Sequence, residues 1–228
     1  MREPKQERAV RTRAIILRAA AEVFDELGFS GANIREITHR AGITQGAMYF
    51  HFKSKEDLAR ALMKAQPSTV LPHTATSGLQ GLVDLTLVWS HQLRQDVLLR
   101  AGVRLTGEQN SFGVHDATPY REWAEVLAER LREARAQGEL ADHVDIGSMA
   151  DFVVSACTGM QMYSQVATGR QDLSERVVAM WQHLLPALCT GEARASIDAS
   201  ASRAEALTHS GVPVGERIAP SVLASRGR

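Results

Sequence analysis

The chain of 228 residues is long enough for one large domain or two small ones, and its 26 Lys+Arg balance its 26 Asp+Glu to a net charge of zero. It has no run of about 18 apolar residues, and its charged N-terminus lacks the apolar core of a signal peptide. We therefore expect a cytoplasmic protein with no membrane contact, in which Cys157 and Cys189 are reduced thiols.

The charges are unevenly distributed along the chain. Residues 1–66 carry 12 Lys+Arg against 8 Asp+Glu, including all four lysines, whereas residues 67–190 carry 9 against 14. A basic N-terminal part beside an acidic remainder is typical of a phosphate-binding head on a body that avoids nucleic acid. Chance produces a bias of this size too, so by itself it supports DNA binding only weakly.

The first predicted helix runs from about Glu7 to Leu27. Its apolar side chains recur at the period of an amphipathic helix: Ile15, Ile16, Ala19, Val23, Phe24 and Leu27. Gly28 is expected to end this helix, because glycine readily adopts the positive φ found at helix C-termini.

Residues 34–52, IREITHRAGITQGAMYFHF, predict two short helices joined by a tight turn. Ile34 and Ile37 form an apolar edge on the first of them. Gly42 suits a turn that needs positive φ, and Thr44 is placed to cap the second helix. Two helices joined in this way form a helix-turn-helix, whose second helix enters the major groove of DNA. The structural alternative is an ordinary pair of packed helices in an α-bundle.

The second helix and its neighbours carry side chains suited to DNA. The candidate DNA-binding residues are Arg35, Thr44, Gln45, Gly46, Tyr49, His51, Lys53 and Lys55. Glutamine pairs bidentately with adenine, a threonine methyl group can meet a thymine methyl group, and Gly46 permits a close approach of the backbone. The tyrosine hydroxyl, the imidazole and the cations are expected to hold phosphates.

Four apolar residues are expected to form the core that fixes the angle of the second helix: Phe24, Ile37, Phe50 and Phe52. For the polar residues a structural alternative stays open. Lys53 and Lys55 also fit a solvated helix start, and His51 also fits a packed aromatic ring without a DNA role.

The rest of the chain continues the helical pattern, and no segment shows the alternation of a strand. Ser54 is expected to cap a fourth helix that ends near Pro67, before a hinge over residues 67–77. Five more helices are predicted, over 79–93, 97–107, 119–138, 146–169 and 173–189, with Asp96, Asp145 and Asp172 as N-caps and a polar loop over 107–118. We therefore predict an all-α fold of about nine helices.

Three parts follow from this pattern: a three-helix DNA-binding head over residues 1–53, a helical bundle over 54–190 and a mostly disordered tail over 191–228. The tail is rich in Ala, Ser, Gly and Pro and shows little periodicity. The last two bundle helices are apolar on more than one side. Such helices must bury the excess apolar surface against a partner, which predicts a homodimer.

Residues 12–63 resemble the N-terminal domain of the TetR family of transcriptional repressors. The matching features are Phe24, Gly28-Phe29, Gly42-Ile43-Thr44, the aromatic cluster 49–52 and the segment 53–58. The resemblance implies a dimer on double-stranded operator DNA, assembled through the helices at 145–169 and 173–189. It also implies a small-molecule effector bound in the larger domain.

A narrower resemblance covers most of residues 8–190. The segments YREWAEVLAERL (120–131) and SACTGMQMYS (155–164) resemble the γ-butyrolactone-type autoregulator receptors of actinomycetes. This resemblance implies that a γ-butyrolactone or butenolide releases the protein from promoters of secondary-metabolite genes. The implied ligand-binding residues are Gln66, Trp123, Thr158 and Gln161, which offer hydrogen-bond donors and, in the indole, apolar area for a lactone. Independently of the resemblance, Trp89 is a candidate for the apolar sleeve around the ligand.

Alternatives to these assignments stay open in the sequence. Trp123 also fits a core anchor beside Leu127, and the Thr158 hydroxyl also fits a bond back to a helix carbonyl. Gln45 stands where the receptor group commonly has a basic residue, which implies a changed base preference or a lost phosphate contact. The alternative function is a TetR-type repressor that responds to an antibiotic or a pathway intermediate, for example one that controls efflux.

Nothing in the sequence indicates catalysis. The eight histidines are scattered, no His/Cys/Asp cluster has metal-ligand spacing, and no glycine-rich phosphate loop is present. We therefore expect no enzyme activity, no cofactor and no metal site.

Overall fold

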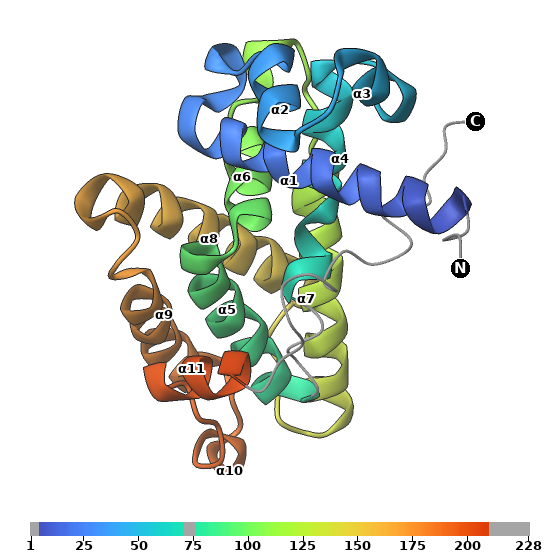
Figure 1. The fold of residues 1–228 in the computed structure, drawn as a ribbon. Coiled ribbons are helices and arrows are strands. Elements are labelled where there is room, and N and C mark those ends of the chain that lie inside the picture. The colour runs from blue at the N-terminus through green and yellow to red at the C-terminus, as the bar shows by residue number, and fades with distance from the viewer. Residues whose placement is uncertain (1–4, 71–75, 210–228) are drawn as a thin grey trace. The chain divides into compact units, whose positions relative to one another are not determined.

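The computed structural model describes residues 5–70 and 76–209, and every regular element among them is a helix (Figure 1). The predicted all-α fold is confirmed. The nine predicted helices correspond to α1 (Lys5–Gly31), α2 (Ile34–Ala41), α3 (Gln45–His51), α4 (Lys55–Val70), α5 (Gly78–Gln95), α6 (Val97–Gly107), α7 (Thr118–Ala136), α8 (Ile146–Thr168) and α9 (Leu173–Leu188). A 3-10 helix, η2 (Gln109–Phe112), follows α6, and α10 (Gly191–Arg194) and α11 (Ala201–His209) follow α9.

The helices form two compact units. The first unit holds α1–α4, α6 and η2, and the second holds α5 and α7–α11. The predicted domain division after residue 53 differs from the division in the structure, because α4 and α6 belong to the same unit as α1–α3. The chain passes from one unit to the other after Thr69, Gln95 and Asp116.

One apolar core holds the first unit together. Its fully buried members come from five helices and include Ile16, Leu17, Phe24, Ile37, Met48, Leu58, Leu62 and Leu105. The helix α6 lies along α1, and η2 adds Phe112, whose ring centroid is 4.2 Å from that of Phe29. Burial of this apolar surface is the main term that stabilises the unit.

Local signals set several helix ends as predicted. Gly28 has φ 68° and interrupts α1, after which the chain returns to helix as far as Gly31. The carboxylate of Asp96 accepts a bond from Leu98 N at 2.8 Å and caps α6. Asp145 caps α8 in the same way.

Two predicted features of the helix ends are wrong. Asp172 does not cap α9, because its carboxylate instead accepts bonds from the Ser164 and Thr168 hydroxyls and from Arg176. The helix α4 continues to Val70, so the predicted hinge does not begin at Pro67. Residues 71–75 of that predicted hinge lie outside the described residues.

The helix α5 is the centre of the second unit. All its residues from Gly81 to Leu93 are buried, including several polar ones, and α7, α9 and α11 pack against it. The helix α8 packs against α7 and α9. The indole Nε1 of Trp181 donates to the Thr86 hydroxyl at 2.7 Å and ties α9 to α5.

The prediction of a disordered tail over 191–228 is wrong for its first part. Residues 191–209 contain α10 and α11, and α11 packs against α5 and α9. The low periodicity of this segment gave no sign of a helix, because its order depends on contacts with helices far away in the sequence. Residues 210–228 lie outside the described residues.

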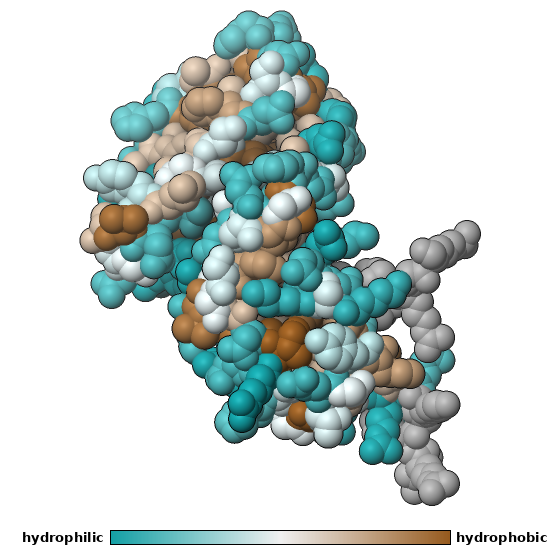
Figure 2. Space-filling view, turned by 90° about the horizontal axis from the view of Figure 1, so that it is seen from above, coloured by the Kyte–Doolittle hydropathy of each residue, from teal (hydrophilic) through white to brown (hydrophobic). Residues whose placement is uncertain are grey.

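No helix within the described ranges is both long and apolar enough to cross a membrane. On the face seen in Figure 2, brown hydrophobic residues are interspersed among teal hydrophilic ones.

Candidate nucleic-acid interface

The helix-turn-helix is built by local hydrogen bonds of the predicted kind. Gly42 lies in the left-handed region with φ 65° and ψ 33°, and the next residue, Ile43, donates its N–H to Thr38 O at 3.1 Å. The Thr44 hydroxyl accepts the N–H of Ala47 at 3.2 Å and caps α3. The predicted turn glycine and the predicted cap are both confirmed.

The buried side of α3 fixes its angle on the first unit. Met48 and Phe52 lie one helical turn apart and are buried in the core with Ile37. The Arg13 guanidinium lies 4.2 Å from the centroid of the Phe52 ring. This packing leaves α3 little freedom to rotate, so the side chains on its outer face are held in fixed positions.

The prediction that Phe50 belongs to the core is wrong, because 78% of this residue is exposed. Met48 and Phe52 take the buried positions, and a residue halfway between them in sequence lies on the opposite side of the helix. The Phe50 ring contacts His51 edge to face, with centroids 5.2 Å apart. Phe50 is therefore an exposed aromatic of the outer face of α3.

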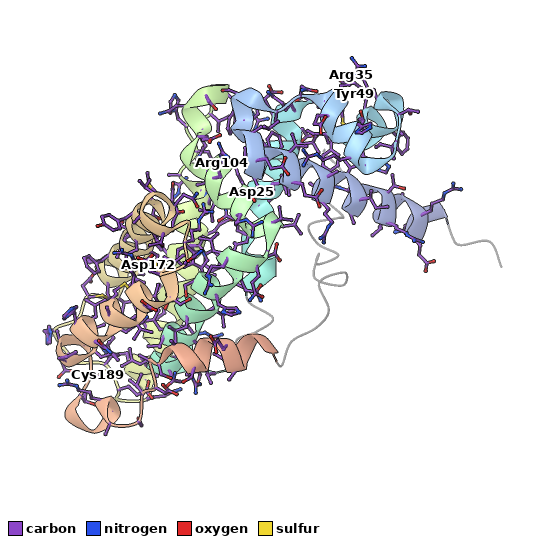
Figure 3. All side chains as sticks on the ribbon, turned by 60° about the vertical axis from the view of Figure 1, so that its left-hand side comes forward. Asp25, Arg35, Tyr49, Arg104, Asp172 and Cys189 are labelled. Atoms are coloured by element: carbon purple, nitrogen blue, oxygen red, sulfur yellow. The ribbon has the colours of Figure 1, made fainter. Side chains whose placement is uncertain are left out.

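The outer face of α3 presents a mostly uncharged surface. Gln45, Gly46 and Phe50 are exposed, and Tyr49 is half-exposed at 50%. Arg35, at the second position of α2, is exposed beside them, and Figure 3 shows Arg35 and Tyr49 projecting on the same side of the first unit. The structure thus exposes Gln45, Gly46 and Tyr49 on α3, with Arg35 on the same side as Tyr49.

Lys55 has a different role from the predicted one. Its ammonium donates to the carbonyl oxygens of Phe29 at 2.8 Å and Ala32 at 2.9 Å, and it lies 4.2 Å from the Phe29 ring centroid. These bonds hold the end of α1 near the start of α2. The Lys55 ammonium group is thus used for contacts within the first unit. Lys53, by contrast, is exposed, and only its backbone N–H is bonded by the Asp57 carboxylate.

His51 is half-buried near Arg13. Burial and the charge of Arg13 both lower the pKa of the His51 imidazole below its usual value. The ring is therefore neutral at pH 7 in the free protein.

An ion-pair cluster that the sequence analysis missed joins α1 to α2. Arg40 donates to the Glu26 carboxylate at 2.6 and 2.7 Å and to Glu36 at 2.9 Å. The bond to Glu26, then that to Glu36, raise the pKa of Arg40. The spacing of Glu36 and Arg40 along α2 is a usable signal for one of these pairs, but the partner on α1 is not visible in the sequence.

A second missed cluster attaches α6 and η2 to α1. Arg100 Nε lies 2.7 Å from Asp25 Oδ2, and Arg104 Nη1 donates to the Asp25 backbone oxygen at 2.6 Å. Figure 3 labels Arg104 and Asp25. Glu108 accepts the Phe29 N–H at 2.8 Å and pairs with Arg104. Together these bonds hold α6 on the helix that supports the helix-turn-helix.

The predicted effector residues are divided between the two units. Gln66 lies in the first unit, where it is buried and donates to the Thr106 hydroxyl at 2.9 Å. The other four lie in the second unit: Trp89 on α5, Trp123 on α7, and Thr158 and Gln161 on α8. The Thr158 hydroxyl donates to Val154 O at 2.8 Å, which is the structural alternative left open in the sequence.

The helix α8 has an exposed apolar side. The large hydrophobic residues exposed there are Phe152, Met162, Tyr163 and Val166, with Val166 at 89%. Val153 and Cys157 occupy its buried side. This distribution agrees with the apolar excess predicted for α8 from the sequence.

Two family models match this chain. The model of the bacterial regulatory proteins of the tetR family matches residues 16–62, and that of the tetracyclin repressor-like C-terminal domain matches residues 76–190. The chain therefore belongs to the TetR family, a class of transcriptional regulators that are not enzymes.

Three similar proteins show which members of the TetR family this chain resembles. The A-factor receptor protein of Streptomyces griseus is 41% identical over 184 residues, which are 81% of this chain and 66% of that protein, just under two thirds of its length. The structure of TylP, a TetR regulator from Streptomyces fradiae, is 39% identical, with a TM-score of 0.79 over 91% of this chain and 92% of TylP. A γ-butyrolactone receptor, an ArpA-like protein, is 31% identical, with a TM-score of 0.68 over 89% of this chain and 99% of that one.

Proposed function

We propose that this protein is a homodimeric DNA-binding repressor that a γ-butyrolactone or butenolide releases from operator DNA upstream of secondary-metabolite genes. The observation that carries the proposal is the outer face of α3, where Gln45, Gly46 and Tyr49 are exposed on a helix fixed from below by Met48 and Phe52. A rigid recognition helix of this kind suits the major groove.

The division of tasks on this face follows the chemistry of its groups. The Gln45 amide can read one base by two hydrogen bonds. Because the Thr44 hydroxyl is used as the helix cap, Thr44 offers mainly its methyl group to a thymine. Arg35, Tyr49 and Lys53 hold phosphates and set the register, while Lys55 acts by supporting the unit.

A dimer follows from the size of this face and from the apolar side of α8. One short helix contacts few bases, and two copies reading two half-sites supply the missing affinity. Phe152, Met162, Tyr163 and Val166 provide the apolar surface that a second copy would cover. Exposed apolar residues gathered on one helix are costly in water, so their burial in a dimer is favourable.

The effector class rests on the relatives and on the second unit. Two of the similar proteins are described as receptors, one for A-factor and one for γ-butyrolactone. Trp89, Trp123 and Gln161 lie on three helices that pack in one unit, and two indoles with a buried amide suit a ligand that is mostly apolar with one polar end. Gln66 is assigned instead to the contact between α4 and α6.

The DNA assignment is tested by selecting bound sequences from a pool of random duplexes. We expect an inverted repeat with two half-sites about one helical turn apart or a multiple of it, because a two-fold dimer reads a two-fold operator. Gln45→Ala is expected to relax the choice of one base pair in each half-site, at a cost of about 1–3 kcal/mol. The matched control is Gln171→Ala, an exposed glutamine at the turn between α8 and α9. Selection of no sequence, or identical selectivity in the Gln45 variant, would refute the assignment.

A further inference from the structure

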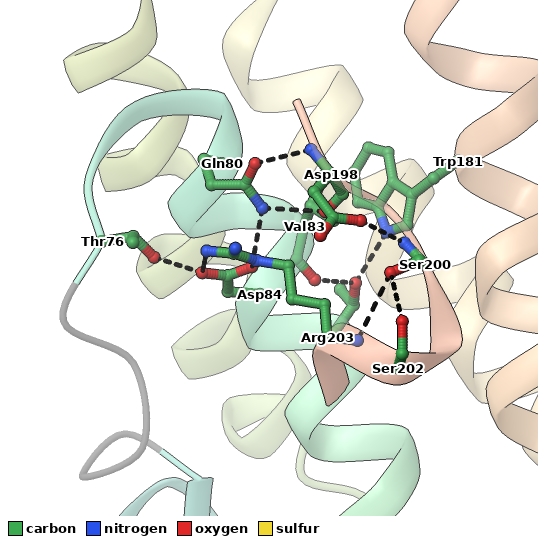
Figure 4. A network of polar contacts seen from close by, with 10 residues as sticks. Thr76, Gln80, Val83, Asp84, Trp181, Asp198, Ser200, Ser202 and Arg203 are labelled. Carbon is green, nitrogen blue, oxygen red and sulfur yellow. Dashed lines mark hydrogen bonds and ion pairs between the residues drawn. The ribbon is translucent and has the colours of Figure 1, made fainter. Parts of the chain in front are cut away.

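Asp84 is a fully buried carboxylate on α5 of the second unit. Four hydrogen bonds satisfy it (Figure 4). Two come from its own segment, from the Thr76 hydroxyl at 2.5 Å and the Gln80 amide at 2.7 Å. The other two come from α11, where Arg203 donates from Nε at 2.5 Å and from Nη2 at 2.8 Å. Arg203 thus supplies the positive charge of a bidentate ion pair.

The segment that leads into α11 is also fixed on α5. Gln80 Nε2 donates to Asp198 O at 2.9 Å, and Gln80 Oε1 accepts the Asp198 N–H at 2.8 Å (Figure 4). The Asp198 carboxylate in turn accepts the Ser200 N–H at 2.9 Å, just before α11 begins. These bonds set the position at which Arg203 meets Asp84.

Part of the cover of α5, including the partner of its buried carboxylate, therefore comes from a segment outside the family pattern. The matching family model ends at residue 190, whereas α11 comprises residues 201–209. A carboxylate buried without a counter-charge is strongly unfavourable. If α11 leaves, Asp84 loses its ion pair, and water reaching this part of α5 becomes favourable.

We propose that α11 is a strap that closes the second unit over α5, fastened by the Asp84–Arg203 ion pair, and that release of the strap exposes to solvent the side of α5 that α11 covers. The strap is a conformational device of the C-terminal segment and is independent of the DNA and effector assignments. Since α5 also carries Trp89 and packs against α7, the strap stabilises the helix at the centre of the proposed effector unit.

Hydrogen exchange of the full chain, followed by mass spectrometry of peptides from α5 and α11, tests the strap directly. Arg203→Gln is expected to speed exchange in both helices by at least about tenfold and to lower the melting temperature by roughly 5–10 °C. Arg203→Lys is expected to give exchange rates and a melting temperature between those of Arg203→Gln and the wild type, because an ammonium cannot form the same bidentate pair.

Two further variants keep the result interpretable. Arg132→Gln removes an arginine that pairs with Glu125 and Glu129 on the exposed side of α7. It should change neither the hydrogen exchange of α5 and α11 nor the melting temperature, because such surface pairs contribute little to stability. Asp84→Asn combined with Arg203→Gln removes both charges. This double variant should regain most of the lost melting temperature, while α11 still exchanges faster than in the wild type.

Wild-type exchange in α5 and α11 of Arg203→Gln would overturn the proposal. Faster exchange confined to α11 would also overturn it, because the burial of α5 would then not depend on the strap. If Arg203→Gln does not fold, the double variant decides. Folding of the double variant supports the fastening, and failure of both variants to fold overturns the claim that the ion pair is a releasable contact.

Discussion

Lys53 and Lys55 lie two positions apart, yet their ammonium groups have different surroundings. Lys55 donates to two backbone oxygens inside the first unit, whereas the Lys53 side chain is exposed. Lys53→Ala is expected to weaken operator binding and to lower the slope of log K against log salt concentration by about 1 per subunit, with unchanged stability. Lys55→Ala should leave the slope nearly unchanged and lower the free energy of unfolding by about 1–3 kcal/mol.

Salt titrations of DNA binding and urea melts of the two variants measure both effects, and each variant is the control for the other. A larger change of the salt slope in Lys55→Ala than in Lys53→Ala would contradict the assignment.

The depressed pKa of His51 gives the DNA complex a predicted pH dependence. The imidazole is neutral in the free protein, because burial and Arg13 lower its pKa. A phosphate contact favours the imidazolium, so binding takes up a proton and affinity rises as the pH falls from about 7.5 to about 5.5. Fluorescence anisotropy at constant salt measures this slope, and His51→Gln should remove it. A slope that persists in the variant would show that another group binds the proton.

The same pKa shift acts oppositely on folding. Because protonation is less favourable in the folded state than in the unfolded state, the contribution of His51 to stability is present above the unfolded pKa of about 6.5 and is lost as the pH falls through the folded value. The anisotropy measurements should therefore be made well below the melting temperature at each pH.

The role of a residue can be predicted from the sequence where it depends on residues nearby in the chain. It cannot be predicted in this way where it depends on partners far away in the chain. Gly42 and Thr44 act within a single turn and behave as predicted. The prediction that Phe50 lies in the core is wrong, because Met48 and Phe52 already fill the buried side of a short helix. Lys55 was assigned to phosphate because its carbonyl partners, more than twenty positions earlier in the chain, are invisible in the sequence.

We expect the proposed dimer to form through the apolar side of α8. Val166→Glu and Phe152→Glu are expected to raise the dimer dissociation constant at least tenfold each, about 1.4 kcal/mol, because a charge would be buried in an apolar interface. Sedimentation measurements over a range of concentrations give this constant. Leu27→Glu, an exposed leucine of α1, is the matched control. Variants of α8 that remain dimers at the wild-type concentrations would place the interface elsewhere.

Periodicity predicted the helices α1–α9 and failed for α11. The nine helices carry apolar residues at three- and four-residue spacing, which reports their buried sides directly. The helix α11 is held by the Asp84–Arg203 ion pair and by contacts with α5 and α9, and its sequence shows little amphipathic pattern. The composition of the segment from residue 191 onward therefore predicts disorder, although contacts with α5 and α9 hold α11 in place.

The chain as a whole crosses between its two units three times within the described residues. A contiguous division at residue 53 was the natural prediction, because sequence patterns do not show that α6 returns to the first unit. Arg100, Arg104 and Glu108 hold α6 on α1. A signal from the proposed effector would therefore have three covalent connections to the first unit, one through α4 and one through each end of α6.

Effector-dependent DNA release tests the central proposal most directly. The measurement is a gel shift of the purified protein on the DNA upstream of its own gene, titrated with synthetic γ-butyrolactones and butenolides. We expect a specific complex that a lactone reduces roughly 5–150-fold, which corresponds to a coupling of about 1–3 kcal/mol. Trp123→Ala should bind the same DNA without responding to the lactone, because the indole provides ligand contact and not DNA contact. Absence of a specific complex would contradict the repressor assignment. A complex that no lactone releases would contradict the effector class and favour an antibiotic or a pathway intermediate.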